Sequence, residues 1–100
     1  MDKMIDIPSV GEILVEEFMQ PKGLSAYKLA KDILVPVSRI QDIIKGRRKV
    51  TVDTSIRLGV YFGISERYFY NIQNDIDFRK QKAEMKDDLK RITSMESQSA

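Results

Sequence analysis

Hydrogen-bond donors gather in one stretch of the chain, residues 38–49. The donors are Ser38, Arg39, Gln41, Lys45, Arg47, Arg48 and Lys49. Guanidinium and amide groups at the start of a helix donate to base edges in the major groove, and arginine and lysine also bind phosphate oxygens. The chemistry that this stretch offers is therefore the recognition of double-stranded DNA.

Groups that commonly carry catalysis are missing from the same chain. Its 100 residues include no histidine, cysteine or tryptophan. The side chain that titrates near neutral pH, the thiolate nucleophile and the usual transition-metal ligands are thus absent. The paired carboxylates Glu16-Glu17 and Asp87-Asp88 diverge on a helix by about 100° per residue, so they do not converge on a reacting group. We expect no enzyme, no metal and no cofactor.

Charge is separated along the sequence. The chain carries 17 basic and 15 acidic residues, a net charge of +2. Residues 22–50 hold eight basic and two acidic residues, a net +6, whereas residues 1–20 hold one and five, a net −4. The positive segment coincides with the donor-rich stretch, as contact with phosphates requires.

The elements that position these donors are predicted to be helices. No run of alternating apolar and polar residues is bounded by a hairpin dipeptide. The predicted helix starts are Ser9 (with Glu12 as a capping box), Ser25, Pro36, Thr51 and Ser65, and the stops are Pro21 with Gly23, Gly46 and Gly63. A charged amphipathic segment runs from Ile76 to about Ile92. We predict an all-α fold, a compact five- to six-helix bundle.

Residues 25–46 have the pattern of a helix-turn-helix. At about 100° per residue, the buried side of its second helix is formed by Ile40, Ile43 and Ile44, and the outward side by Ser38, Asp42 and Lys45, flanked by Arg39 and Gln41. Leu34 occupies the turn position that is usually glycine, where a positive φ would cost about 1 kcal/mol. Asp42 either accepts from a cytosine amino group or pairs with Lys45, and we favour the pairing.

The second half of the chain is interpreted mainly as core. Ile56, Gly59 and Phe62 are predicted to face inward. The aromatic residues are Tyr61, Phe62, Tyr68, Phe69 and Tyr70, which we interpret as core with a part available to a dimer contact rather than as a platform for single strands. The segment from Phe78 to Ile92 is expected to be a partly frayed helix that extends the dimer. We predict one domain over residues 1–92 and a disordered tail over residues 93–100.

The compartment is predicted from composition. A chain without cysteine does not depend on disulfides and fits a reducing cytosol. The N-terminus lacks the continuous apolar region of a signal peptide, and no apolar run approaches the roughly 18 residues needed to span a bilayer. We expect a cytoplasmic protein that does not enter a membrane.

From about Val10 to Gln73 the chain resembles HigA-type antitoxins of the XRE/Cro helix-turn-helix superfamily. The matching motifs are Gly11-Glu12-Ile13-Leu14, Glu16-Glu17-Phe18, Leu24-Ser25, Leu29-Ala30-Lys31, Val35-Pro36, Ser38-Arg39-Ile40, Gly46-Arg47-Arg48, Thr51, Asp53-Thr54, Arg57-Leu58, Tyr61-Phe62-Gly63, Ser65 and Asn71-Ile72-Gln73. The resemblance implies a lambda-repressor-like fold and a homodimer that binds a palindromic operator in its own promoter. It also implies neutralisation of a small, basic, RNA-cleaving HigB-type toxin by complex formation.

The candidate DNA-binding residues are Ser25, Tyr27, Val37, Ser38, Arg39, Gln41, Lys45, Arg47, Arg48 and Lys49. Ser38, Arg39 and Gln41 are expected to read bases, and the basic cluster 47–49 to contact phosphates. Glu12, Glu16 and Glu17 are the candidate toxin-binding residues, although an ordinary solvated face explains them equally well.

Two departures from the family pattern keep alternatives open. Ser9-Val10 stands where the family commonly has His-Pro, and Ala26 stands where it often has a glutamine that could contact phosphate. One alternative is a phage- or plasmid-type repressor without a toxin. The other is a protein-interaction module whose helix-turn-helix no longer reads DNA, which Leu34, Ala26 and the outward Asp42 would favour.

Overall fold

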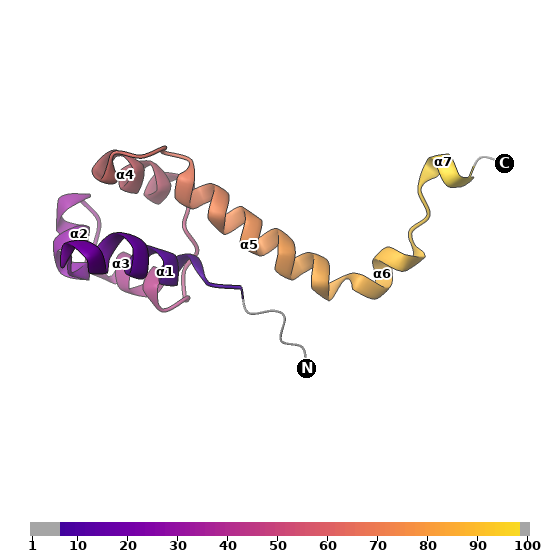
Figure 1. Ribbon diagram of the computed structural model, residues 1–100, viewed down its shortest axis with the longest axis horizontal. Helices are drawn as coiled ribbons and strands as arrows, with labels where there is room; N and C mark the ends of the chain where they lie inside the picture. The colour runs from indigo at the N-terminus through magenta and orange to yellow at the C-terminus, as the bar shows by residue number, and fades with distance from the viewer. Residues whose placement is uncertain (1–6, 99–100) are drawn as a thin grey trace.

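A computed structural model describes residues 7–98, and within that range every regular element is a helix (Figure 1). The elements are α1 (Val10–Ile13), the π-helix η2 (Leu14–Met19), the 3-10 helix η3 (Gln20–Lys22), α2 (Ala26–Asp32), α3 (Val37–Ile44), α4 (Val52–Phe62), α5 (Tyr68–Glu84), α6 (Lys86–Arg91) and α7 (Met95–Gln98). The predicted all-α class is confirmed, and α2 and α3 form the predicted helix-turn-helix.

The first helical segment begins and ends where the sequence predicts. The Ser9 hydroxyl accepts from the Glu12 N–H at 3.1 Å, and Glu12 Oε1 accepts from the Ser9 N–H at 3.1 Å, which is a capping box. α1, η2 and η3 follow one another without a break until Gly23, which takes a left-handed φ of 61°. Pro21 lies inside the last turn, so the glycine ends the helix.

The core draws one fully buried residue from each of five elements. Leu14, Leu29, Ile40, Leu58 and Phe69 are 0% exposed, and they come from η2, α2, α3, α4 and α5 respectively. Rings from Phe18 and Phe62 pack on Phe69, with centroids 5.0 and 6.4 Å away. The interpretation of this part of the aromatic cluster as core is confirmed. Each such burial stabilises the fold by about 1.5–3 kcal/mol.

Two glycines allow backbones to touch. A Cβ on Gly11 would lie 2.4 Å from the carbonyl oxygen of Ile43, so α1 packs directly on the end of α3. A Cβ on Gly59 would lie 2.6 Å from Cα of Glu66, so α4 packs on the connection to α5. Both contacts are closer than any side chain permits, and they fix the helix-turn-helix against its neighbours.

The inward face of α4 differs from the prediction at Ile56. That side chain is 42% exposed, whereas Thr54 and Ser55 are buried at 1% beside Leu58. The Ser55 hydroxyl donates to the carbonyl of Glu66 at 2.6 Å and accepts from the Tyr70 N–H at 3.0 Å. Because small polar residues bond to the following connection, the helix turns them inward and leaves Ile56 outside.

Ser65 does not begin a helix, as was predicted, because it makes a turn. Its hydroxyl accepts from the Arg67 N–H and its carbonyl from the Tyr68 N–H, both at 3.1 Å, and α5 begins only at Tyr68. α5 then continues through Ile76 to Glu84 without interruption. The separate segment predicted from Ile76 is therefore the second half of α5 followed by α6.

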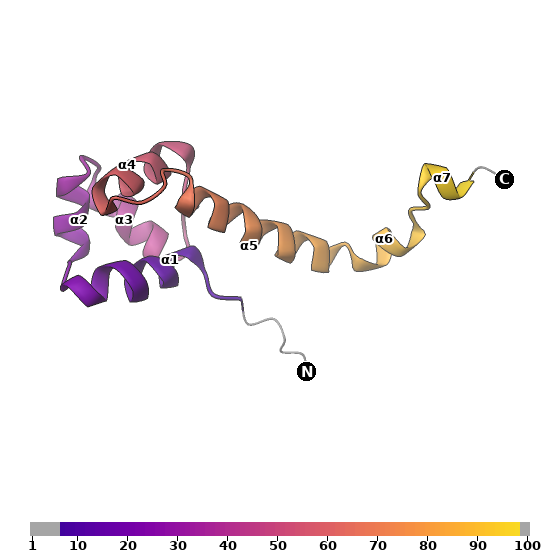
Figure 2. The same cartoon turned by 45° about the horizontal axis from the view of Figure 1, so that its top comes forward.

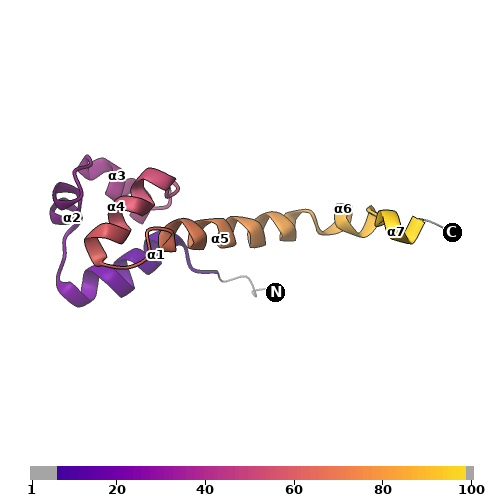
Figure 3. The ribbon, with the colours of Figure 1, turned by 90° about the horizontal axis from the view of Figure 1, so that it is seen from above.

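Residues 7–76 form a head, and residues 77–98 form an arm that leaves it (Figures 1 and 3). The four helices α1 to α4 gather at one end of the molecule (Figure 2), whose extents are 60 × 31 × 21 Å. The radius of gyration is 17.6 Å, against about 13 Å for a compact chain of this length. The domain limit at residue 92 and the disorder of residues 93–100 stay predictions.

Candidate nucleic-acid interface

The turn between α2 and α3 is closed around Leu34. The Leu34 N–H donates to the Lys31 carbonyl at 3.3 Å, and the Val35 N–H donates to the Ala30 carbonyl at 3.0 Å. This pattern is a Schellman motif, whose left-handed position usually holds glycine. Leu34 adopts φ 64° there, and its side chain is 80% exposed. The turn therefore keeps its usual geometry and carries the strain, and packing of the leucine does not offset it.

α3 presents the face that the sequence predicts. Ile40 and Ile43 are 0% and 1% exposed and Ile44 is half-buried, while Ser38, Gln41 and Lys45 lie outside. Val37 is half-buried against the core, so less of it faces solvent than of Ser38. A short apolar face thus holds the helix on the head and leaves its polar face toward solvent.

At the start of α2, the Ser25 hydroxyl caps the helix. It accepts from the Lys28 N–H at 3.0 Å, so the predicted start of α2 is confirmed. Tyr27, on the first turn, is 67% exposed. The two side chains are the parts of α2 that were predicted to reach DNA, and the structure leaves the phenol of Tyr27 open to solvent.

Asp42 pairs with Arg47, and the predicted pair with Lys45 is wrong. Asp42 Oδ1 accepts from Arg47 Nε at 3.2 Å and from Nη2 at 3.0 Å. The chain reverses at Gly46, where φ is 79°, and the N–H groups of Arg47 and Arg48 both donate to the Asp42 carbonyl. This reversal brings Arg47 back over the helix end, so the carboxylate that would repel phosphate is neutralised.

The eight basic residues of segment 22–50 fall into two groups. Those in ion pairs are Lys28 with Asp32, Arg39 with Asp53, Arg47 with Asp42, and Lys49 with Asp77, at 3.0–3.2 Å. Lys22, Lys31, Lys45 and Arg48 make no ion pair with any residue of the described range 7–98. Exposed pairs contribute about 0–1 kcal/mol, so a phosphate oxygen can displace them.

Asp53, at the start of α4, joins three parts of the site. Its Oδ1 accepts from Arg39 Nη1 at 3.2 Å and from Arg57 Nε at 2.7 Å. Arg57 Nη1 in turn donates to the carbonyl of Ile33 at 2.9 Å, at the end of α2. The hydrogen bond from Arg57 is the main cause that lowers the pKa of Asp53. Sequence reasoning missed this network because its members lie 14 and 24 residues apart.

A second contact ties α2 to α4. The Tyr61 hydroxyl donates to Asp32 Oδ2 at 2.7 Å. This hydrogen bond lowers the pKa of Asp32, with Lys28 as the next cause, and raises the pKa of Tyr61. Tyr61 was interpreted as core, and it is 37% exposed at the head's surface with its hydroxyl fastening the end of α2.

The loop after α3 is fastened to α5. The Val50 N–H donates to Gln73 Oε1 at 3.2 Å, and Gln73 Nε2 donates to Asp77 Oδ1 at 3.2 Å. Asp77 also holds Lys49, through an ion pair of 3.1 Å. The basic cluster that follows α3 is therefore attached at one end to α3 and at the other to α5.

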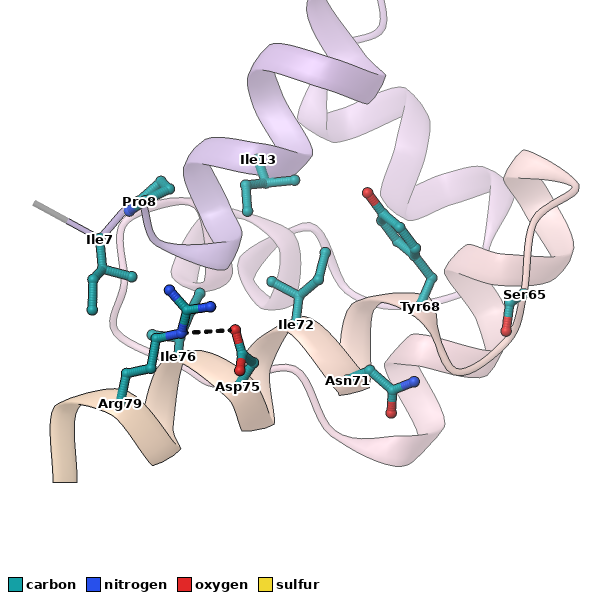
Figure 4. Close-up of a pocket in the computed structure, with 10 residues that line it drawn as sticks. All are labelled: Ile7, Pro8, Ile13, Ser65, Tyr68, Asn71, Ile72, Asp75, Ile76 and Arg79. Carbon is teal, nitrogen blue, oxygen red and sulfur yellow. Dashed lines mark ion pairs between the residues drawn. The ribbon is translucent and has the colours of Figure 1, made fainter. Parts of the chain in front are cut away.

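The candidate toxin-binding residues lie on the first helical segment. The Glu12 carboxylate is used in the capping box, whereas Glu16 and Glu17 are exposed on η2. Beside α1 an open hollow faces α5 (Figure 4), with Ile13, Ile72 and Ile76 among its lining residues. The ion pair between Asp75 and Arg79 lies at its edge, at 3.1 Å. These residues are not brought to the α3 face, so the structure separates the two predicted surfaces.

Two other kinds of site were searched for in residues 7–98. No cluster of three or more acidic, histidine or cysteine side chains that could hold a metal ion is found there. Within the same range no helix is both long enough and apolar enough to cross a membrane.

Comparison with known proteins agrees with this geometry. Residues 15–69 match the model of the helix-turn-helix family HTH_3. The chain is 42% identical over 76 residues to virulence-associated protein I of Dichelobacter nodosus, covering 74% of this chain and 70% of that protein. It is 32% identical over 69 residues to antitoxin HigA-1 of Vibrio cholerae, covering 69% and 65%.

A solved structure extends the likeness to nearly the whole chain. The Pseudomonas aeruginosa antitoxin HigA, solved with the higBA promoter, superposes with a TM-score of 0.82 at 27% identity. The match covers 89% of this chain and 97% of that one. The likeness therefore includes most of α5 as well as the helix-turn-helix.

Proposed function

The chain belongs to the helix-turn-helix family, in its XRE type, and we propose from this that it is a HigA-like antitoxin that represses its own promoter. One observation carries the proposal. α3 is packed on the head by Ile40 and Ile43 and turns its polar face to solvent, beside cations that lack an ion-pair partner in the described range. A helix held in this way is the reading element of a DNA-binding motif.

In the proposed complex, the N-terminal half of α3 enters the major groove. Ser38, Arg39 and Gln41 donate to base edges, and the Val37 methyls contact a thymine methyl. Phosphate contacts come from the residues around the groove, which are Ser25, Tyr27, Lys45, Arg47, Arg48 and Lys49. Arg47 and Lys49 exchange exposed carboxylate partners for phosphate oxygens, at small cost.

We further propose that the chain acts as a homodimer in the cytoplasm and binds a palindromic operator. An apolar patch on the arm supports the dimer, because Phe78, Met85 and Leu89 line one exposed hollow there. A two-fold pair of heads would place two copies of α3 in successive major grooves of one DNA face, one helical turn apart.

The antitoxin activity would lie on the opposite kind of charge. The exposed carboxylates of Glu16 and Glu17 suit a small, basic, RNA-cleaving toxin, and complex formation would neutralise it. Since this acidic segment is separate from α3, one chain can bind a toxin and an operator through different surfaces.

The interaction-only alternative is weakened by two observations. Leu34 was one of its reasons, yet the turn keeps the geometry of a helix-turn-helix with φ 64°. Asp42 was another, and its charge is neutralised by Arg47. Neither departure removes the polar face that would read DNA.

The DNA-binding part is tested with a labelled duplex from the region upstream of the gene, titrated by anisotropy at several salt concentrations. We expect saturable, salt-dependent binding to an inverted repeat. Binding that does not prefer the repeat over a scrambled duplex would contradict it.

The toxin part is tested in cells by expressing the reading frame adjacent to the gene. We expect a small basic protein that arrests growth alone and is harmless when this chain is produced with it. The absence of such a frame would favour a stand-alone repressor.

A further inference from the structure

The guanidinium of Arg39 is restrained, although it is predicted to read a base. Arg39 is the third residue of α3, and its Nη1 donates to Oδ1 of Asp53 at 3.2 Å. Asp53 is the second residue of α4, so the contact bridges the first turns of two helices. The Arg39 side chain is 30% exposed, whereas that of Arg47, just past the helix end, is 60% exposed.

The carboxylate that holds Arg39 is itself fixed. The same Oδ1 accepts from Arg57 Nε at 2.7 Å, one turn along α4. Arg57 Nη1 donates to the Ile33 carbonyl at 2.9 Å, where α2 ends and the motif's turn begins. The position of Asp53 is therefore set by the helix-turn-helix that it serves. The lowered pKa of Asp53 keeps it charged near neutral pH.

A base contact and a phosphate contact make different demands on an arginine. A bidentate contact to guanine requires the planar group in one orientation, and an unrestrained side chain loses rotamer entropy to reach it. A phosphate accepts a cation from many directions. Arg48 fits the second case, because it has no ion-pair partner in the described range. Arg39 fits the first.

We infer that Asp53 is a positioning residue for sequence recognition, which holds the Arg39 guanidinium at the start of α3 in the orientation that reads a base edge. The inference rests on the proposed function, because it needs α3 to bind an operator. Two other roles are possible for the same contact. Asp53 could only fasten α3 to α4, or it could withhold Arg39 from DNA. The three roles give different results when the charge is removed.

The test replaces Asp53→Asn, which keeps the size of the side chain and removes its charge. Asp75→Asn is the matched control, because Asp75 also pairs with an arginine four residues on, at 3.1 Å, but lies on α5. Affinity is measured by anisotropy for the duplex that the unmodified chain enriches from a random library, and for a scrambled duplex of equal length. Thermal unfolding shows that each variant is folded.

We expect Asp53→Asn to reduce the ratio of the two affinities by about tenfold, mainly through weaker binding of the enriched duplex. Binding of the scrambled duplex should stay the same or become tighter, since a negative charge near DNA is removed. Asp75→Asn should leave the ratio unchanged. In an Arg39→Ala background, Asp53→Asn should reduce the ratio no further, because the group that it positions is gone.

Several results would overturn the inference. They are an unchanged ratio, equal weakening on both duplexes, a further loss in the Arg39→Ala background, or tighter binding of the enriched duplex, the last being the mark of withholding. If the asparagine variant does not fold, Asp53→Ser, which suits a first helical turn, carries the same expectations. An unmodified chain that prefers no duplex would instead overturn the proposed function, and the inference with it.

Discussion

The helix-turn-helix and the arm are both helical and charged, yet they are held in different ways. In residues 25–46, Leu29, Ile40 and Ile43 are 0–1% exposed. In the arm, residues 77–98, Phe78 and Ile92 are 73% and 65% exposed. Side-chain bonds to distant elements hold the first region, whereas the printed ion pairs from α6 stay local, as between Arg91 and Asp88. The difference shows that a rigid base supports the polar face of α3, and that the arm's apolar side has no cover within its own chain.

The largest expected effect comes from the same substitution made in the two regions. Ile40→Ala removes a fully buried side chain from α3 and should lower the free energy of unfolding by about 2–5 kcal/mol. Ile92→Ala, in the arm, should change it by less than about 1 kcal/mol. Urea unfolding of both variants measures the two values, and equal losses would remove the distinction between the regions.

DNA binding should depend on the first region and not on the arm. Arg39→Ala should cost about 1–3 kcal/mol on the operator and little on random DNA. Arg48→Ala should weaken binding to both DNAs and reduce the salt slope by about one unit. Arg91→Ala, an 80% exposed arginine of α6, is the control and should change neither. Equal losses for Arg39→Ala on the two DNAs would contradict its base-reading role.

A substitution in the turn should stabilise the protein. Leu34→Gly relieves a left-handed φ of 64° at a side chain that is 80% exposed, so little packing is lost. We expect a gain of about 1 kcal/mol in the free energy of unfolding. Differential scanning calorimetry checks it, with Leu34→Ala as the control that keeps a Cβ and should give no such gain. A lower melting temperature for the glycine variant would show that Leu34 is not strained.

The smallest expected effect is on acid stability. Hydrogen bonds, from Tyr61 first and then Lys28, lower the pKa of Asp32 in the folded state. The unfolded chain thus binds a proton more readily, so this contribution is present above the usual carboxyl range near pH 4 and is lost as pH falls below it. Tyr61→Phe removes the hydroxyl alone, and its melting temperature should fall less steeply than that of the unmodified protein on acidification. An identical fall in both proteins would contradict the assignment.

The parts of the fold that the sequence predicted correctly depend on local interactions. Ser9, Ser25 and Thr51 each cap a helix through a bond to a residue three positions ahead, and Gly23 and Gly63 end helices with a left-handed φ. The spacing of Ile40 and Ile43 likewise determines which side of α3 is buried. Such features are visible within a few residues.

The features that the sequence did not reveal depend on chain reversals and distant partners. Arg47 reaches Asp42 only because the chain turns back at Gly46, and Asp53 meets Arg39 only once α4 lies beside α3. Ile56 was expected inside because apolar residues were counted, whereas hydrogen bonds to the next connection turned Ser55 inward. α5 passes Ile76 because no glycine or proline stops it there.

The central claim is that the polar face of α3 reads a DNA sequence. Its most direct test is the ratio of affinities of the unmodified chain for the enriched duplex and for a scrambled one, measured at physiological salt. The account predicts a ratio of about a thousand or more, with both affinities falling as salt is raised. A ratio near one, or binding to the enriched duplex that salt does not weaken, would contradict it.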